Sequence, residues 1–171
     1  QQGSEMKRIR TIIFGVGAVF ILSVGSVISV TEPLIWNRTE SAPLGLYWRS
    51  DGPLTLNMWA VVSANSEAAN WAAERGYIGA DWPIIKRVRA MEGDEVCRKD
   101  YAISINGEPV AIAREHDRSS RELPVWQGCF RLKSHEVFLL NDHPNSLDGR
   151  YFGATDMDDV RGTAALLWSR R

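Results

Sequence analysis

Lys86 lies in a short segment, residues 83–90, in which apolar and basic residues alternate. If this segment is a β-strand, one of its faces carries the even-numbered residues Ile84, Lys86, Val88 and Ala90. An ammonium group on an apolar face is disfavoured unless it is paired or loses its proton. A lysine that has lost its proton is a general base. The alternative is a surface lysine whose stem lies on the sheet while its amine reaches water.

Ser41 is the candidate nucleophile that such a base could activate, because a serine hydroxyl attacks a carbonyl once a nearby group takes its proton. It follows a long apolar run by about ten residues. Read alone, a serine before Pro43 and Gly45 is an ordinary turn residue. Together with Lys86, it suggests a membrane-anchored serine/lysine hydrolase.

The chemistry requires that Lys86 be neutral near physiological pH. A free lysine has a pKa of about 10.4, whereas a general base works best when its pKa is about 7–8. Burial against Ile84 and Val88, away from any carboxylate, is the physical means of lowering it.

The apolar run at residues 11–30 contains no charged residue and matches a hydrocarbon core of about 30 Å. Because Lys7, Arg8 and Arg10 precede it, the positive-inside rule predicts a cytoplasmic N-terminus and export of everything after the run. We therefore expect a single transmembrane helix over residues 9–30 in a bacterial inner membrane and a periplasmic domain over residues 31–171. The alternative is a cleaved signal peptide, whose apolar region is usually shorter. Residues 1–5 look like an expression scar, so residues 1–8 combine that scar with a cytoplasmic end.

The composition limits the number of domains and the classes of partner that the protein can have. The 171 residues allow one ordinary domain with a short appendage, and a net charge of −1 argues against a nucleic-acid partner. The two cysteines, Cys97 and Cys129, fall in the exported part, where an even count suggests one disulfide. Two separate buried thiols are the alternative.

Short strands separated by turns predict a mainly β domain with one short helix. The Ala-rich segment 66–75 predicts that helix, with Asn65 or Ser66 at its start and Gly76 at its end. Asn106-Gly107, between two alternating runs, predicts a β-hairpin. Residues 31–40 are expected to be a polar connection, and the charged residues 115–122 a solvated loop. The expected strands cover residues 45–49, 58–63, 101–105, 109–113, 130–132, 137–140 and 160–168.

Three motifs occur in an order that resembles the type I signal peptidases. Residues 85–88, followed by residues 93–96, are similar to the catalytic-lysine box of that family. Residues 141–153 are similar to a second box nearer the C-terminus. The pattern around Ser41, Asn-x-Thr-x-Ser-x-Pro-x-Gly-Leu-Tyr, points to the TraF-type branch of conjugative plasmid transfer, which matures the pilin subunit. The resemblance covers the chain after Met6 and implies a signal peptidase I-like β domain.

The resemblance also implies roles for individual residues. Ser41 matches the nucleophile and Lys86 its general base. Thr39 matches a hydroxyl that helps to bind the oxyanion, together with the backbone N–H of Ser41. Ser146 matches a serine that orients the lysine amine. A charged pair, Asp148 and Arg150, matches structural support at the edge of the site, and the same residues are also typical of a turn.

The implied substrate is a pilin precursor or another pre-protein embedded in the lipid bilayer, and the dyad needs no cofactor or metal. Two departures, Ala42-Pro43 after the serine and Ala90-Met91-Glu92 before Gly93, argue against a general signal peptidase that removes signal peptides from many exported proteins. A third possibility is a non-enzymatic periplasmic module that assembles a conjugation or type IV secretion system. No metal spacing or Ser-His-Asp motif is present, so we expect the three histidines to be surface loop residues: His116, His135 and His143.

Overall fold

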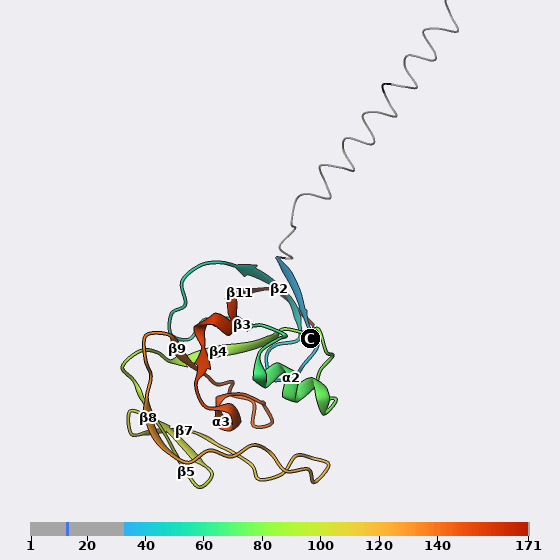
Figure 1. Cartoon of the computed structure of the whole chain (residues 1–171). Coiled ribbons are helices and arrows are strands. Elements are labelled where there is room, and N and C mark those ends of the chain that lie inside the picture. Colours follow the sequence, from blue (N-terminus) through green and yellow to red (C-terminus); the bar gives the residue numbers. More distant parts are fainter. Residues whose placement is uncertain (1–12, 14–32, 171) are drawn as a thin grey trace, which may run out of the picture. The chain divides into compact units, whose positions relative to one another are not determined.

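Antiparallel strands dominate the chain from Pro33 onward (Figure 1). The computed structural model describes residue 13 and residues 33–170. Its strands are β1 (Leu34–Asn37), β2 (Gly45–Ser50), β3 (Trp59–Val62), β4 (Ile84–Ala90), β5 (Glu95–Lys99), β6 (Ala102–Ile105), β7 (Glu108–Ile112), β8 (Gly128–Arg131), β9 (Glu136–Leu139), β10 (Thr155–Asp156) and β11 (Val160–Ser169). Its helices are α2 (Glu67–Glu74), α3 (Gly149–Phe152) and the 3-10 helix η1 (Met157–Asp159).

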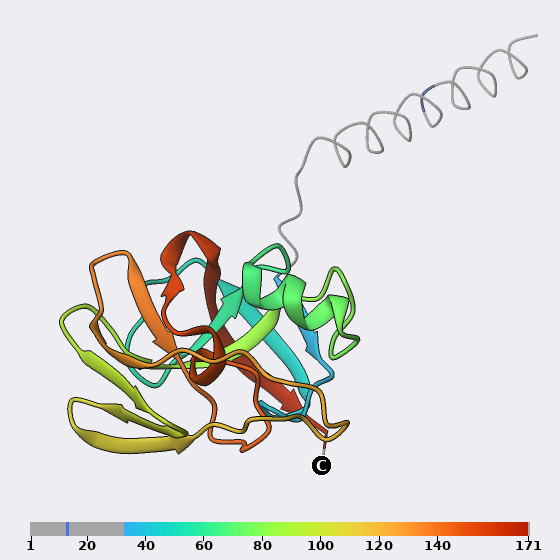
Figure 2. The ribbon, with the colours of Figure 1, turned by 60° about the horizontal axis from the view of Figure 1, so that its bottom comes forward.

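The strands form two sheets. The larger sheet has seven strands in the order β1-β2-β11-β3-β4-β9-β10, and the smaller has four in the order β7-β6-β5-β8. In Figures 1 and 2 the smaller sheet lies at one end of this part of the chain and α2 lies well away from it. The segment that joins β7 to β8 extends from the small sheet toward α2 (Figure 2). The expected mainly β class is therefore confirmed.

Local sequence signals account for two predicted elements. The Ser66 hydroxyl accepts a hydrogen bond from the Ala69 N–H at 3.2 Å and so caps α2, as expected of a serine at a helix start. The hairpin of β6 and β7 turns at Asn106 and Gly107, whose φ angles are +52° and +85°. Both angles are positive, which is the requirement of a type I′ turn and the reason for the Asn-Gly pair.

Strand β4 lies inside the large sheet between β3 and β9, so it can hold a side chain firmly. Val88 and Ala90 are completely buried on the face that Lys86 shares, as predicted. The other face of β4, which carries the odd-numbered residues, is less exposed to water than the alternation of residue types suggests. Ile85 packs there with Tyr47 and Val61 in a second core cluster.

Two expectations about local structure are wrong, and one strand was not predicted. Residues 31–40 are not only a polar connection, because Leu34–Asn37 form the edge strand β1, in which Leu34 pairs with Trp48 of β2. Residues 33–170 contain a second short helix, α3, where the sequence predicted only one helix and Asp148 was expected to be part of a supporting pair or a turn. The Asp148 carboxylate accepts from the Arg150 N–H and caps this helix. Strand β5 was not predicted, because its five residues, Glu-Val-Cys-Arg-Lys, show no alternation of apolar and polar types.

No helix in residue 13 or residues 33–170 is long and apolar enough to cross a membrane. The predicted transmembrane segment, residues 9–30, lies outside the described residues except for Ile13.

Candidate active site

Ser41 lies in the loop between β1 and β2, and the buried side chain of Asn37 organises this loop. The Asn37 amide nitrogen donates to the carbonyl oxygens of Thr39, Ala42 and Pro43 at 3.0–3.1 Å. Its amide oxygen accepts from the Thr39 N–H at 3.2 Å. The sequence pattern included Asn37 but gave it no role. Its position at the end of β1, with three carbonyls to satisfy, explains why an amide side chain is needed there.

A second support holds the other side of the same loop. Burial raises the pKa of Tyr47 to about 12, so its hydroxyl stays protonated. That hydroxyl donates to the Pro43 carbonyl at 2.9 Å. Ala42 packs beside Tyr47 in the core cluster that also contains Ile85. The residue after Ser41 is therefore anchored in the core, and Ser41 itself remains half-buried at the surface of the site.

The structure brings Lys86, Ser41 and Ser146 together, although they come from three separate parts of the chain. The Lys86 amine donates to Ser41 Oγ at 3.2 Å and to Ser146 Oγ at 2.9 Å. Lys86 is only 4% exposed and Ser146 is completely buried. Across the same 3.2 Å, a neutral lysine amine can instead accept the Ser41 proton.

Burial is the main reason why the pKa of Lys86 is lower than usual. Loss of hydration lowers the pKa of Lys86 from 10.5 to about 8. The Asp148 carboxylate acts in the opposite direction, and the Arg150 guanidinium lowers the pKa further. The expectation that Lys86 lies away from any carboxylate is thus wrong, but Arg150 offsets part of the effect of Asp148.

Asn141 fixes the main chain on both sides of Lys86. Its side-chain oxygen accepts from the Arg87 N–H at 2.8 Å, and its side-chain nitrogen donates to the Ile85 carbonyl at 3.2 Å. Strand β9 ends at Leu139, so this side chain continues the pairing with β4 where the strand itself has ended. The sequence reasoning assigned no role to Asn141; a polar residue directly after the apolar run 137–140 was the available signal.

Asp148 and Arg150 hold the main chain of Asn141 in place. They form an ion pair with an Nε–Oδ1 distance of 2.8 Å, and their side chains are 0% and 2% exposed. Asp148 accepts from the Asn141 N–H at 3.0 Å, and Arg150 donates to the Asn141 carbonyl at 2.6 Å. This pair was expected to support the site from its edge. The pair is instead buried, where each charge is stabilised by the other and would be costly without it.

Thr39 lies next to the candidate nucleophile, with its hydroxyl oxygen 3.4 Å from Ser41 Oγ. The Thr39 hydroxyl donates to Asn37 Oδ1 at 3.0 Å. The backbone N–H of Ser41 has no hydrogen-bond acceptor within residues 33–170. These two groups are therefore close enough together to serve one oxygen atom, provided that the Thr39 hydroxyl rotates away from Asn37.

Two histidines, His143 and His116, line the cavity beside Ser41, although both were expected only as surface loop residues. His143 is half-buried, and its Nδ1 accepts from the Asn145 N–H at 3.2 Å. His116 and His135 are exposed, as predicted. Among residues 33–170, no histidine is hydrogen-bonded to Ser41, and no cluster of His, Cys, Asp or Glu has the arrangement of a metal site.

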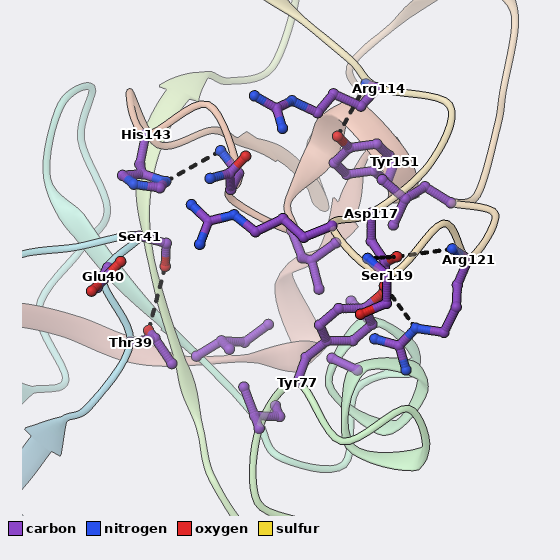
Figure 3. A pocket seen from close by; sticks show the side chains of 18 of the residues that line it. Thr39, Glu40, Ser41, Tyr77, Arg114, Asp117, Ser119, Arg121, His143 and Tyr151 are labelled. Carbon is purple, nitrogen blue, oxygen red and sulfur yellow. Dashed lines mark hydrogen bonds and ion pairs between the residues drawn. The ribbon is translucent and has the colours of Figure 1, made fainter.

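A cavity of about 470 Å³ opens beside Ser41 and Lys86. Figure 3 shows Thr39, Glu40 and Ser41 on one side of this cavity, with Tyr77, Asp117 and Arg121 on the other. Its floor includes Ile84, from the same face of β4 as Lys86. The arrangement suits an extended chain that passes over a serine hydroxyl and a buried amine.

The predicted cysteine pair is present as a disulfide between Cys97 and Cys129. The two residues are direct partners in the β5–β8 ladder of the smaller sheet.

Comparison with known families identifies the class of protein to which the chain belongs. A family described as signal peptidase, peptidase S26, matches residues 6–169, nearly the whole chain. The chain belongs to the peptidase S26 family. Because S26 is a family of serine peptidases, the resemblance stated from the sequence motifs is confirmed.

The chain is also similar to proteins named for plasmid or conjugal transfer. The chain is 32% identical over 169 residues to the plasmid transfer protein TraF of Escherichia coli, covering 91% of this chain and 93% of the relative. It is 29% identical over 160 residues to the conjugal transfer protein TraF of Agrobacterium tumefaciens (strain 15955), covering 86% and 89%. A solved signal peptidase I of Enterococcus faecalis is 16% identical, with a TM-score of 0.38, over 67% of this chain and 98% of that one.

Proposed function

We propose that this chain is a membrane-anchored serine endopeptidase that processes the pilin precursor during conjugative plasmid transfer. Ser41 is the nucleophile and Lys86 the general base. The observation that carries the proposal is the 3.2 Å contact between Ser41 Oγ and the buried Lys86 amine, with Ser146 holding that amine from the other side. The relatives named for plasmid and conjugal transfer support the process.

The reaction begins when neutral Lys86 accepts the proton of Ser41 Oγ, which attacks the peptide carbonyl. The backbone N–H of Ser41 and the Thr39 hydroxyl hold the negative oxygen of the tetrahedral intermediate. One such donor commonly contributes about 3–4 kcal/mol to stabilising the transition state. Protonated Lys86 then gives its proton to the leaving amine, and an acyl-enzyme on Ser41 remains.

Release of the acyl-enzyme repeats the same steps with a second nucleophile. Lys86 removes a proton from water, the hydroxide attacks the ester carbonyl, and the proton returns to Ser41 Oγ as the ester bond breaks. An amine of the pilin itself can replace water as the acceptor. The product is then a cyclic subunit that is lighter than the linear peptide by one water molecule.

Apolar side chains on the larger sheet agree with a substrate at the membrane surface. Several on β1, β2 and β11 are exposed: Leu34, Trp36, Trp48 and Trp168. Trp36 and Trp168 stack with ring centroids 5.8 Å apart. Since aromatic rings favour the bilayer interface, this face and the apolar run at residues 11–30 suit a periplasmic domain that works beside the inner membrane.

A pilin-processing assay in membranes tests the proposal. We expect Ser41→Ala and Lys86→Ala to abolish processing, while the matched controls Ser134→Ala and Lys133→Ala, at exposed positions outside the cavity, process normally. Normal processing by either Ser41→Ala or Lys86→Ala would falsify the dyad and favour a non-enzymatic assembly module. Cleavage of many exported precursors would favour a general signal peptidase, the alternative that the family match also allows. Mass spectrometry of the processed pilin separates hydrolysis from cyclisation.

A further inference from the structure

The charged loop between β7 and β8 contributes more basic than acidic side chains to the cavity beside Ser41. Arg114, Arg118 and Arg121 line this cavity together with Asp117, whereas Glu115 and Glu122 do not. Glu115 instead accepts a hydrogen bond from the Tyr101 hydroxyl at 3.2 Å. The sequence predicted a solvated loop here. The loop is largely exposed, but one of its sides is also a wall of the cavity.

This wall is held in place at its two ends. Ala113 and Leu123, which flank the loop, pack with Tyr151 in a core cluster, and the Tyr151 hydroxyl accepts from the Arg114 N–H at 3.1 Å. Near the tip, Arg121 donates to the Arg75 carbonyl at the end of α2 at 2.8 Å. The arginines are therefore carried on a loop that is fixed at its two ends and is linked through Arg121 to the end of α2.

One of the two carboxylates on the cavity lining is already engaged. Asp117 accepts from the Tyr77 hydroxyl and pairs with Arg121 at 2.7 Å, and these contacts hold its pKa below the usual range. Within residues 33–170, the guanidinium groups of Arg114 and Arg118 make no hydrogen bond or ion pair. The only other carboxylate on the lining is Glu40, beside Ser41.

The cavity therefore has a local excess of positive charge that the whole chain lacks. Its lining contains four arginines, the fourth being Arg38, against the two carboxylates of Glu40 and Asp117. This leaves a formal excess of two positive charges before Lys86 is counted, in a chain whose net charge is −1. Such an excess attracts an anion, and a guanidinium group binds a carboxylate through two parallel hydrogen bonds.

The remaining lining of the cavity has different chemistry. It includes small and aliphatic side chains: Ala68, Ala72, Ile78, Ile84 and Leu147. One cavity thus offers apolar contacts near Lys86 and unpaired guanidinium groups on the loop. A peptide with a carboxylate some residues away from a small or apolar cleavage site would match both the apolar and the basic parts of this lining.

We propose that Arg114 and Arg118 form a specificity subsite for a carboxylate of the peptide substrate. The carboxylate belongs either to an acidic side chain near the scissile bond or to a free C-terminus. This inference rests on the proposed peptidase function, since the subsite shares its cavity with Ser41. Arg114 and Arg118 select the substrate and take no part in the bond-breaking steps.

The test measures peptide binding by the full chain carrying Ser41→Ala, in nonionic detergent, so that it does not depend on cleavage. Fluorescent apolar peptides carry one Glu moved along the sequence, with a Gln series as reference, and each ends in an amide. A third series has Gln with a free C-terminal carboxylate. We expect one position of the carboxylate to tighten binding about tenfold, the discrimination that a charge-assisted hydrogen bond commonly gives.

Adding Arg114→Gln and Arg118→Gln should remove this preference and leave binding of the amidated Gln peptides unchanged. Arg161→Gln, an exposed arginine outside the cavity, is the matched control and should keep the preference. If no carboxylate position is preferred, or if the double variant prefers it as strongly as its parent, the subsite is wrong. Cleavage of the same peptides by the chain with Ser41 intact reports separately on the peptidase function.

Discussion

The side chain of Asn141 is hydrogen-bonded to the main chain on either side of Lys86 and not to the lysine amine. It accepts from the N–H that follows Lys86 and donates to the carbonyl that precedes it, at 2.8 and 3.2 Å. The position of the amine relative to Ser41 therefore depends on a residue that is 55 positions further along the chain. Asn141 is a positioning residue. Its removal should displace the Lys86 amine from Ser41 and have little effect on substrate binding.

Asn141→Ala tests this role. Loss of two buried hydrogen bonds should destabilise the fold by about 1–3 kcal/mol and lower kcat with little change in KM, because Lys86 is displaced from Ser41. The measurements are denaturant unfolding and steady-state peptide cleavage. Asn70→Ala, on the exposed side of α2, is the matched control. A folded Asn141→Ala enzyme with normal kcat would contradict the positioning role.

Arg150→Met tests the buried ion pair with Asp148. Removing one partner leaves an uncompensated buried carboxylate, so we expect a loss of about 3–5 kcal/mol in the free energy of unfolding. The exposed pair of Arg89 and Asp142, at 3.3 Å, is the internal comparison. Arg89→Met should cost about 1 kcal/mol or less. Equal losses in the two variants would show that burial of the Asp148–Arg150 pair is not what stabilises the site.

Lys86→Met tests the altered acidity of Lys86 without any measurement of activity. The folded state holds the pKa of Lys86 at about 8, below the 10.5 of the unfolded chain. Below pH 8 the lysine is charged in both states, and its burial costs stability. As the pH rises from 8 to 10.5, the folded state sheds its proton first, so wild-type stability rises through this window.

The variant should therefore be more stable than wild type below pH 8, and the difference should shrink as the pH approaches 10.5. Thermal unfolding of both proteins across this range measures it. Lys133→Met, at an exposed position, should show no such trend. A stability difference that is independent of pH would mean that Lys86 keeps an ordinary pKa in the folded protein.

Local patterns predicted most of the fold because they depend on neighbouring residues alone. The cap at Ser66, the Asn-Gly turn and the alternation around Lys86 all act within a few positions. Strand β1 was missed because its pairing with β2 is decided by residues across the Ser41 loop. The short helix α3 was missed because four residues carry no helical periodicity.

The candidate site could be predicted only in part for the same reason. Ser41, Lys86 and Ser146 were identified by their motifs, and the structure brings them together. Asn37 and Asn141 were missed because their roles are visible only when the carbonyl and N–H groups they satisfy are known. The nearness of the Asp148 carboxylate to Lys86 also depends on how residues 141–150 fold back onto β4.

The central claim is that neutral Lys86 activates Ser41, and the pH dependence of kcat/KM for peptide cleavage tests it most directly. Purified full-length enzyme is assayed with one peptide over about pH 6 to 10, with the fold checked at each pH and Ser41→Ala as the blank. Activity should rise with pH along a single limb whose midpoint lies near 8, the pKa of Lys86. A rate that stays flat across this range would contradict a lysine base.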